Sequence, residues 1–235
     1  DKNKETDLFV MENYGKKPVF SSFLPGITGE HGIPTWCYYV NRGQAVASFG
    51  MQDKDHAIME FFPAHQSYQN VKRTGFRTFI KRDGVYLEPF SREEIPHRMG
   101  IAMNHLTLEE EDNENKIVTQ VTYFTLPGET EGALVRKLTV CNISDKKVEL
   151  EVLDGMPALI PYGVDMENMK EMGQTVKAWM QVVLQDGIPL FKARASIKDT
   201  ATVTMVEGAN FSVGSLPDGT LLKPVVDAQA VFGYD

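Results

Sequence analysis

Short runs of β-branched and aromatic residues, separated by turn-forming residues, recur along this chain and constrain its fold more than any other feature. Residues 35–41 read TWCYYVN, and after the Arg-Gly pair at 42–43 the chain continues as QAVASFG. Glycine accepts the positive φ of a tight turn, so the two runs predict a β-hairpin. The runs FRTFIK and VYLE flank the Asp-Gly pair at 83–84 and predict a second hairpin.

Further strand-like runs follow at a spacing that is typical of all-β proteins. They lie at residues 57–62, 103–109, 116–125, 133–143, 148–153, 189–195, 200–206 and 225–232. Many short strands with frequent turn signals indicate a sandwich or a barrel. We therefore expect an all-β fold, a large antiparallel β-sandwich with at most one short helix.

One segment, residues 165–185, has a helical period instead. Asp165 is suited to cap a helix, and Gly173 weakens its middle by about 1 kcal/mol. A helix followed by a strand, with the break near Thr175, fits the segment equally well. We expect the apolar stripe of this segment to pack against a sheet rather than to hold a cofactor. The stripe consists of Met166, Met169, Met172, Val176, Met180 and Val183.

The domain organisation follows from length and charge. The chain has 235 residues and a formal net charge of −8, which fits one large domain or two small ones and gives no electrostatic footprint for nucleic acid. We expect a tail or linker over residues 1–20 and a single domain over residues 21–235.

No apolar run is long enough to span a membrane, and the charged start is not a signal peptide, so we expect a cytoplasmic protein without a membrane partner. Because the first residue is not Met, we expect a piece of a longer chain.

Motifs for catalysis or cofactor binding are missing from the sequence. It has no phosphate-binding glycine loop and no Gly-x-Ser-x-Gly elbow, and we expect neither a cofactor nor a metal site. We expect Cys37 and Cys141 to be buried free thiols, with a disulfide as the alternative. The acidic run at 109–112 has calcium-type ligands but no EF-hand spacing, so we expect a solvated hairpin tip. The scattered histidines, for which we expect structural or exposed positions, are His31, His56, His65, His97 and His105.

Binding of a sugar is better supported than catalysis, because two segments combine aromatic with amide and guanidinium side chains. Aromatic rings pack on the apolar face of a sugar, and amides and guanidinium groups bind its hydroxyls. The alternative is that the aromatic residues fill the core while the polar residues decorate its edges. The candidate sugar-binding residues are Trp36, Asn41, Arg42 and Gln44 in the first segment and His65, Arg73 and Arg77 in the second.

Longer stretches of the sequence resemble a known family. Residues 23–50 (FLPGITGEHGIPTWCYYVNRGQAVASFG), 134–144 (LVRKLTVCNIS), 157–163 (PALIPYG) and 177–180 (KAWM) are similar to the N-terminal β-sandwich domain of cellobiose-phosphorylase-like glycoside phosphorylases. These form glycoside hydrolase family 94, and the match is with the subgroup typified by 1,2-β-oligoglucan phosphorylase.

The resemblance implies a galactose-mutarotase-like super-sandwich that precedes a catalytic (α/α)6 barrel in the parent enzyme. Such a parent is a glycosyltransferase that converts a β-glucoside to glucose 1-phosphate with inversion, with inorganic phosphate as co-substrate. This chain would then hold no catalytic residue. It would serve as a scaffold, a dimer surface and a possible sugar-binding loop, with a β-glucan oligosaccharide, the barrel and a second copy as partners. The alternatives are a free-standing aldose-epimerase-like enzyme and a pure protein-interaction module.

Overall fold

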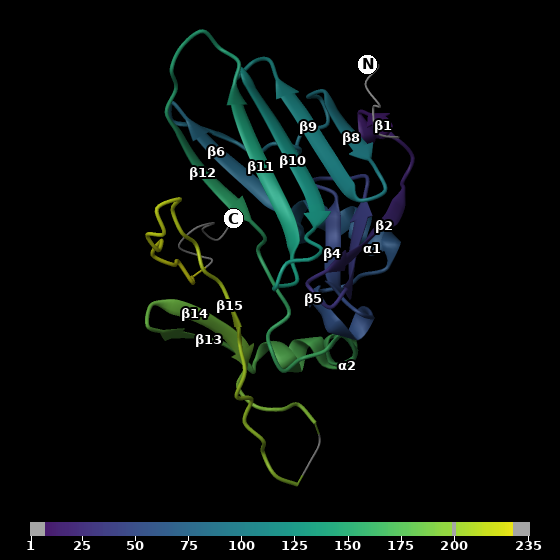
Figure 1. The fold of residues 1–235 in the computed structure, drawn as a ribbon, viewed down its shortest axis with the longest axis vertical. Coiled ribbons are helices and arrows are strands. Elements are labelled where there is room, and N and C mark those ends of the chain that lie inside the picture. The colour runs from purple at the N-terminus through teal and green to yellow at the C-terminus, as the bar shows by residue number, and fades with distance from the viewer. Residues whose placement is uncertain (1–7, 199–200, 228–235) are drawn as a thin grey trace. The chain divides into compact units, whose positions relative to one another are not determined.

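The computed structural model describes residues 8–198 and 201–227, which form mostly antiparallel β-sheet (Figure 1). The described residues contain fifteen strands and two α-helices, so the expectation of a β-rich fold is confirmed and that of at most one short helix is wrong. The single domain expected over residues 21–235 divides after Ala158 into two compact units. No helix among the described residues is long and apolar enough to cross a membrane.

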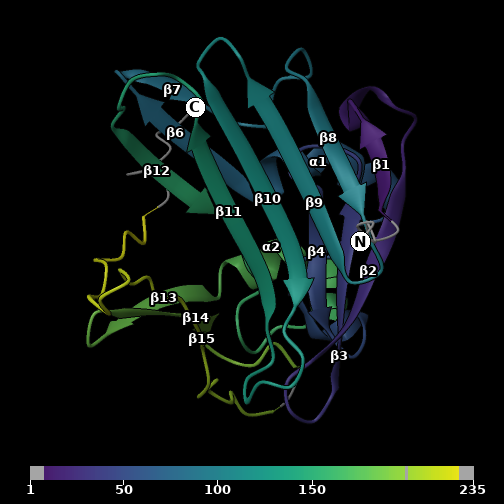
Figure 2. The same cartoon turned by 45° about the horizontal axis from the view of Figure 1, so that its top comes forward.

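The first unit contains a five-stranded antiparallel sheet in the order β1-β8-β9-β10-β11 (Figure 2). Its strands are β1 (Phe9–Glu12), β8 (His97–Ile101), β9 (His105–Asp112), β10 (Ile117–Thr125) and β11 (Leu134–Asn142). The acidic run expected at a solvated tip lies inside β9, where Glu110 and Asp112 are buried. Alternation explains this correction, because every second side chain of the strand points into the core.

Part of the segment expected as a tail belongs to this sheet. Strand β1 pairs with β8, with Phe9 opposite Ile101. The 3-10 turn η1 (Tyr14–Lys16) follows, and Tyr14 exposes only 1% of its surface. The strand has only four residues and stands among charged ones, so its composition resembles a solvated linker although its backbone is paired.

A four-stranded sheet, also in the first unit, has the order β2-β3-β4-β5. The predicted hairpin around Gly43 is confirmed, and its loop holds Gly43 at φ 52° and Ala45 at φ 68°. The 3-10 turn η2 (Lys54–His56) precedes the last strand. The strands are β2 (Ser21–Thr28), β3 (Ile33–Val40), β4 (Val46–Met51) and β5 (Ala57–Met59).

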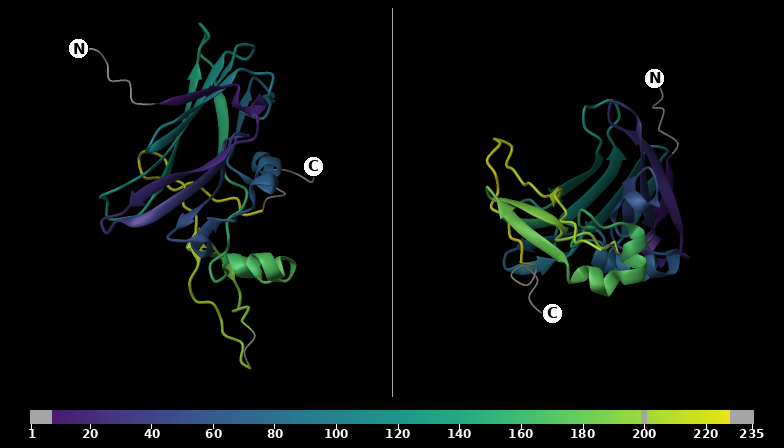
Figure 3. Two further views of the ribbon diagram at one scale, coloured as in Figure 1. Left: turned by 90° about the vertical axis from the view of Figure 1, so that its right-hand side faces the viewer. Right: turned by 90° about the horizontal axis from the view of Figure 1, so that it is seen from below.

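The helix α1 (Ala64–Thr74) contacts β3 and β4 of this sheet (Figure 3). It was not expected as a helix, because its aromatic and polar composition resembles a binding loop. Ser67 and Val71 are four residues apart and both buried, which places them on the same helix face.

A three-stranded sheet completes the first unit, with the order β12-β6-β7. Its strands are β12 (Leu150–Gly155), β6 (Arg77–Arg82) and β7 (Val85–Leu87). Asp83 at φ 50° and Gly84 at φ 82° form the two-residue turn between β6 and β7. Positive φ at both positions is the type I′ geometry that an Asp-Gly pair favours, so the second predicted hairpin is confirmed.

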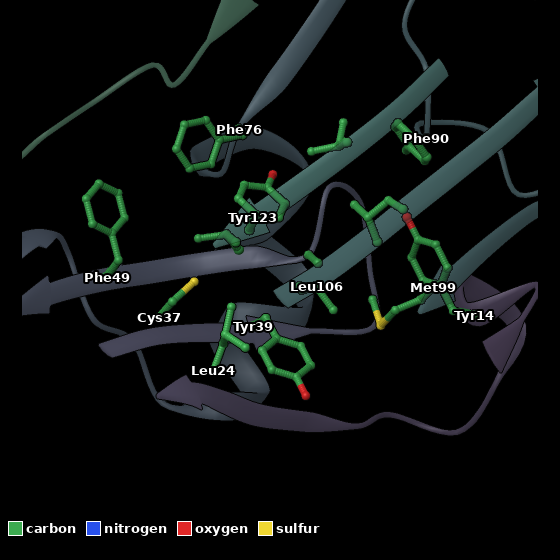
Figure 4. Close-up of a cluster of buried hydrophobic side chains, with 14 of the residues drawn as sticks. Tyr14, Leu24, Cys37, Tyr39, Phe49, Phe76, Phe90, Met99, Leu106 and Tyr123 are labelled. Carbon is green, nitrogen blue, oxygen red and sulfur yellow. The ribbon is translucent and has the colours of Figure 1, made fainter. Parts of the chain in front are cut away.

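One core cluster joins the four-stranded and the five-stranded sheet (Figure 4). Cys37 and Tyr39 of β3 enter it from one sheet, and Leu106 of β9 and Tyr123 of β10 enter it from the other. Cys37 is a buried free thiol, as expected, and burial raises its pKa to about 12. Cys141 is a free but exposed thiol, which corrects the expectation of burial.

The second unit contains α2 (Met166–Lys177) and the sheet β13-β14-β15. Asp165 caps the helix, accepting the backbone N–H of Asn168 at 2.9 Å, and the helix is kinked at Met172, beside Gly173. Since β13 begins three residues after α2 ends, the helix-then-strand alternative is the observed one. The strands of the sheet in the second unit are β13 (Met180–Gln185), β14 (Ile188–Ala193) and β15 (Asn210–Phe211).

Two late strand predictions are not confirmed in the second unit. Within residues 201–206 the structure has only an isolated bridge between Met205 and Ala195. Residues 225–227 form no strand, and residues 228–232 lie outside the described part of the chain.

Candidate functional site

Asn41 and Arg42, two of the residues proposed for sugar binding, hold the backbone of the chain before β2. Asn41 is fully buried, and its amide accepts the N–H of Phe20 at 2.8 Å and donates to the carbonyl oxygen of Pro18 at 2.8 Å. The Arg42 guanidinium donates to the carbonyl oxygen of Lys17 at 3.1 Å. Because their polar groups bind neighbouring backbone, these two side chains position the loop.

Gln44, another candidate of that segment, belongs to a polar cluster centred on the buried side chain of Arg136. The Arg136 guanidinium donates to a carboxylate oxygen of Asp154 and to the amide oxygen of Gln44. Its Nε donates to the Tyr123 hydroxyl at 3.2 Å, and Thr78 Oγ1 donates to Asp154 at 2.6 Å. We call Gln44, Thr78, Tyr123, Arg136 and Asp154 the Arg136 network.

The Arg136 network ties together elements that are distant in sequence. Arg136 comes from β11, Asp154 from β12 and Thr78 from β6. The Arg136 side chain exposes 7% of its surface and that of Asp154 28%. Burial raises the pKa of Tyr123 far above its ordinary value, so its hydroxyl stays protonated and donates to the Gln44 carbonyl oxygen at 2.9 Å.

A hollow of about 90 Å³ with a partly apolar wall lies beside this network, and we call it the polar hollow after the charged side chains that line it. Gln44 and Phe76 form part of its wall, together with Arg77 and Glu88. The Arg77 guanidinium contacts the Glu88 carboxylate through two hydrogen bonds, at 2.7 and 3.0 Å. Gln44 and Arg77 are therefore the two candidate sugar-binding residues that the structure brings to one place.

An aromatic patch lies on the other face of the four-stranded sheet. It consists of Phe23, Trp36, Tyr38 and Phe61, whose ring centroids are between 5.0 and 6.3 Å apart. Tyr38 is buried, Trp36 and Phe61 are half-buried, and Phe23 exposes 48% of its surface. The indole N–H of Trp36 donates to the Asp53 carbonyl oxygen at 3.0 Å, so the ring's orientation is fixed.

The candidates on α1 stand apart from the polar hollow. His65 and Arg73 are both exposed, and Arg73 donates to the Asn70 side chain at 3.3 Å. Neither lines the hollow, whereas Lys72, between them on the helix, does. Of the candidates in the second segment, His65 and Arg73 are therefore exposed to solvent, and Arg77 lines the hollow.

A second buried polar group, Glu110, was missed by the sequence analysis. It exposes 4% of its surface and accepts the backbone N–H of Phe90 at 2.7 Å. Burial raises its pKa to about 7, and the neighbouring Asp112 carboxylate adds to the effect. Asp112 contacts Arg92 at 3.2 Å and accepts backbone N–H groups of the following turn. The alternation of β9 indicates that Glu110 is buried, but the acidic composition of the run led to the expectation of a solvated position.

The described residues include no group of three or more His, Cys, Asp or Glu side chains that could hold a metal ion. The hollow offers hydrogen-bonding groups, and the aromatic patch offers ring faces for stacking. No known protein family and no curated protein matches this chain.

Proposed function

We propose that this chain is a non-catalytic, carbohydrate-associated β-sandwich domain of the galactose-mutarotase-like kind, from a cytoplasmic β-glucan phosphorylase. The observation that supports the proposal is the aromatic patch. Trp36 was a candidate from sequence, and Phe23 and Phe61 stand beside it with accessible ring surface. A pyranose ring offers a face of C–H bonds that packs on such rings, so the patch suits a β-linked glucan.

The parent enzyme would carry out the chemistry on another domain. There, phosphate attacks the anomeric carbon while a carboxylic acid protonates the leaving oxygen, as in inverting mechanisms. This chain supports the barrel and holds the glucan. We therefore expect the chain alone to release no glucose 1-phosphate from a β-glucan. Measurable release would contradict the proposal, and mutarotation of a monosaccharide would indicate an aldose epimerase instead.

Tryptophan fluorescence provides a direct test of sugar binding. The chain has two tryptophans, Trp36 and Trp179, so a Trp179→Phe variant leaves Trp36 as the only reporter. We expect its emission to change and to saturate on titration with β-linked gluco-oligosaccharides at millimolar concentration. An unchanged emission would exclude the patch as a sugar site.

A pair of variants separates stacking on the patch from a general effect of losing an aromatic ring. Phe23→Ala, in the Trp179→Phe background, removes the most exposed ring of the patch and is expected to weaken binding by about tenfold, or about 1.4 kcal/mol. Tyr86→Ala removes a ring that is 73% exposed on β7 and is the matched control. Equal loss in both variants would contradict the assignment.

A protein-interaction role is the second candidate, and β13 favours it. Val182, Val183 and Leu184 are consecutive and expose 45%, 42% and 57% of their surfaces. Consecutive strand residues point to opposite faces, so both faces of this hairpin carry uncovered apolar surface. If this surface joins two copies, Val183→Glu abolishes self-association in sedimentation, whereas Val203→Glu, at a position 81% exposed, leaves it intact.

A further inference from the structure

Residues 13–17, which we call the latch, pass from β1 over the end of β8 and are held by polar contacts. Tyr14, within the latch, is buried, and its hydroxyl donates to the Gly43 carbonyl oxygen at 2.5 Å. The backbone N–H of Asn13 donates to the carbonyl oxygen of His97 at 2.7 Å. Since Gly43 lines the polar hollow, the latch contacts the wall of the hollow directly.

His97 holds the latch through a contact that only one form of its ring permits. Nδ1 lies 2.8 Å from the carbonyl oxygen of Ile95, so it must carry a hydrogen. Nε2 accepts the backbone N–H of Gly15 at 3.2 Å, so it must carry none. Only the neutral ring with its hydrogen on Nδ1 satisfies both partners.

The His97 ring packs closely against the latch. The Tyr14 ring meets the His97 ring edge-on, with centroids 4.5 Å apart. A side chain at Gly15 would place its Cβ 3.0 Å from His97 Nε2, so the contact depends on glycine. His97 itself exposes 6% of its surface.

The charges around His97 are mixed. Burial lowers the pKa of His97, and the positive charges of Lys16 and Lys72 lower it further. The hydrogen bond to Ile95 and the Glu93 carboxylate raise it. Glu110 lies opposite His97 in the register of β8 and β9, with its carboxylate on the backbone N–H of the preceding loop. The neutral ring is therefore the favoured state near pH 7.

We propose that protonation of His97 releases the latch, so that Gly43 in the wall of the polar hollow loses its hydrogen bond from Tyr14. A hydrogen on Nε2 would face the N–H of Gly15, so an accepting contact becomes a clash of two donors. Gly15 must then move away, and Tyr14, its neighbour, loses the packing that directs its hydroxyl to Gly43. Acidification thereby alters the hollow whether or not the hollow binds a sugar.

Amide hydrogen exchange of Gly15, measured by NMR between pH 7.5 and 5 and corrected for intrinsic exchange, tests the proposal. Protection of this amide is expected to fall below pH 6.5, the ordinary value for histidine, by up to about tenfold per pH unit. The fall continues until the ring is protonated in the folded protein. Protection that stays flat over this range would overturn the proposal.

The variant His97→Gln keeps an acceptor and a donor but does not titrate, so its Gly15 protection is expected to be independent of pH. His105→Gln, at a partly exposed position of β9, is the matched control and should retain the response. A pH response that survives in His97→Gln would contradict the proposal. If that variant does not fold, ¹⁵N histidine spectra of the unmodified chain decide. The His97 titration must then lie at the pH where the loss of Gly15 protection levels off, and a loss that levels off at a different pH would overturn the proposal.

Discussion

Replacing Glu110 by glutamine tests whether this buried carboxyl group lowers stability at neutral and alkaline pH. The group accepts one backbone N–H, from Phe90, which a glutamine oxygen can also accept. Its pKa of about 7 in the folded chain stands above the ordinary 4.5. The folded state therefore binds more protons than the unfolded state between these values, and its stability falls as the pH rises from 4.5 through 7.

The size of the effect follows from the same two values. Full ionisation of Glu110 in the folded chain costs about 3 kcal/mol. The wild-type chain should lose about 2.5 kcal/mol through this group between pH 5 and pH 8. Glu110→Gln stays neutral, so its advantage over the wild type should grow by that amount over the same interval.

Urea denaturation at pH 5 and at pH 8, followed by circular dichroism, measures this difference. Glu111→Gln is the matched control, because Glu111 is the next residue of β9 and is exposed; its effect should be small and independent of pH. The reasoning is refuted if the free energy of unfolding of Glu110→Gln differs from the wild type by the same amount at both pH values.

Two further predictions concern the core and the thiols. Arg136→Met should lower the free energy of unfolding by about 1–3 kcal/mol, because Gln44 and Asp154 lose the hydrogen bonds that the guanidinium donates. Arg98→Met, which breaks an ion pair that is 53% exposed at the arginine, should cost about 0–1 kcal/mol; equal losses would argue against the Arg136 network. A disulfide reagent should modify Cys141 rapidly and Cys37 only on unfolding, and fast reaction of two thiols in the native protein would contradict the assigned burial.

Sequence patterns predict correctly the elements whose structure depends mainly on their own residues. Strand β10 occupies nearly the range expected from its alternation, and the Asp-Gly turn at 83–84 sets the β6–β7 register. Strand β1 and helix α1 were missed, because their folding depends on partners outside the segment. β1 is fixed by β8, and α1 by the sheet that it covers.

The candidate site was predictable only in part, for a related reason. Gln44 and Arg77 were identified by residue type, and both line the polar hollow. Arg136 and Asp154 were not, although they meet Thr78 across separations of 58 and 76 residues. Sheet order creates such contacts, and no pattern within one segment encodes it.

The alternation of β3 explains why the aromatic patch, rather than the core, is the place to look for a ligand. Cys37 and Tyr39 point into the shared core, while Trp36 and Tyr38 point to the opposite face. An antiparallel sheet with one buried face ordinarily presents polar side chains on the other. Here that face is aromatic, and α1 covers only part of it, leaving Phe23 half-exposed. Packing under α1 accounts for Tyr38 and for the buried parts of Trp36 and Phe61, and the exposed ring of Phe23 is the surface that the proposed sugar would cover.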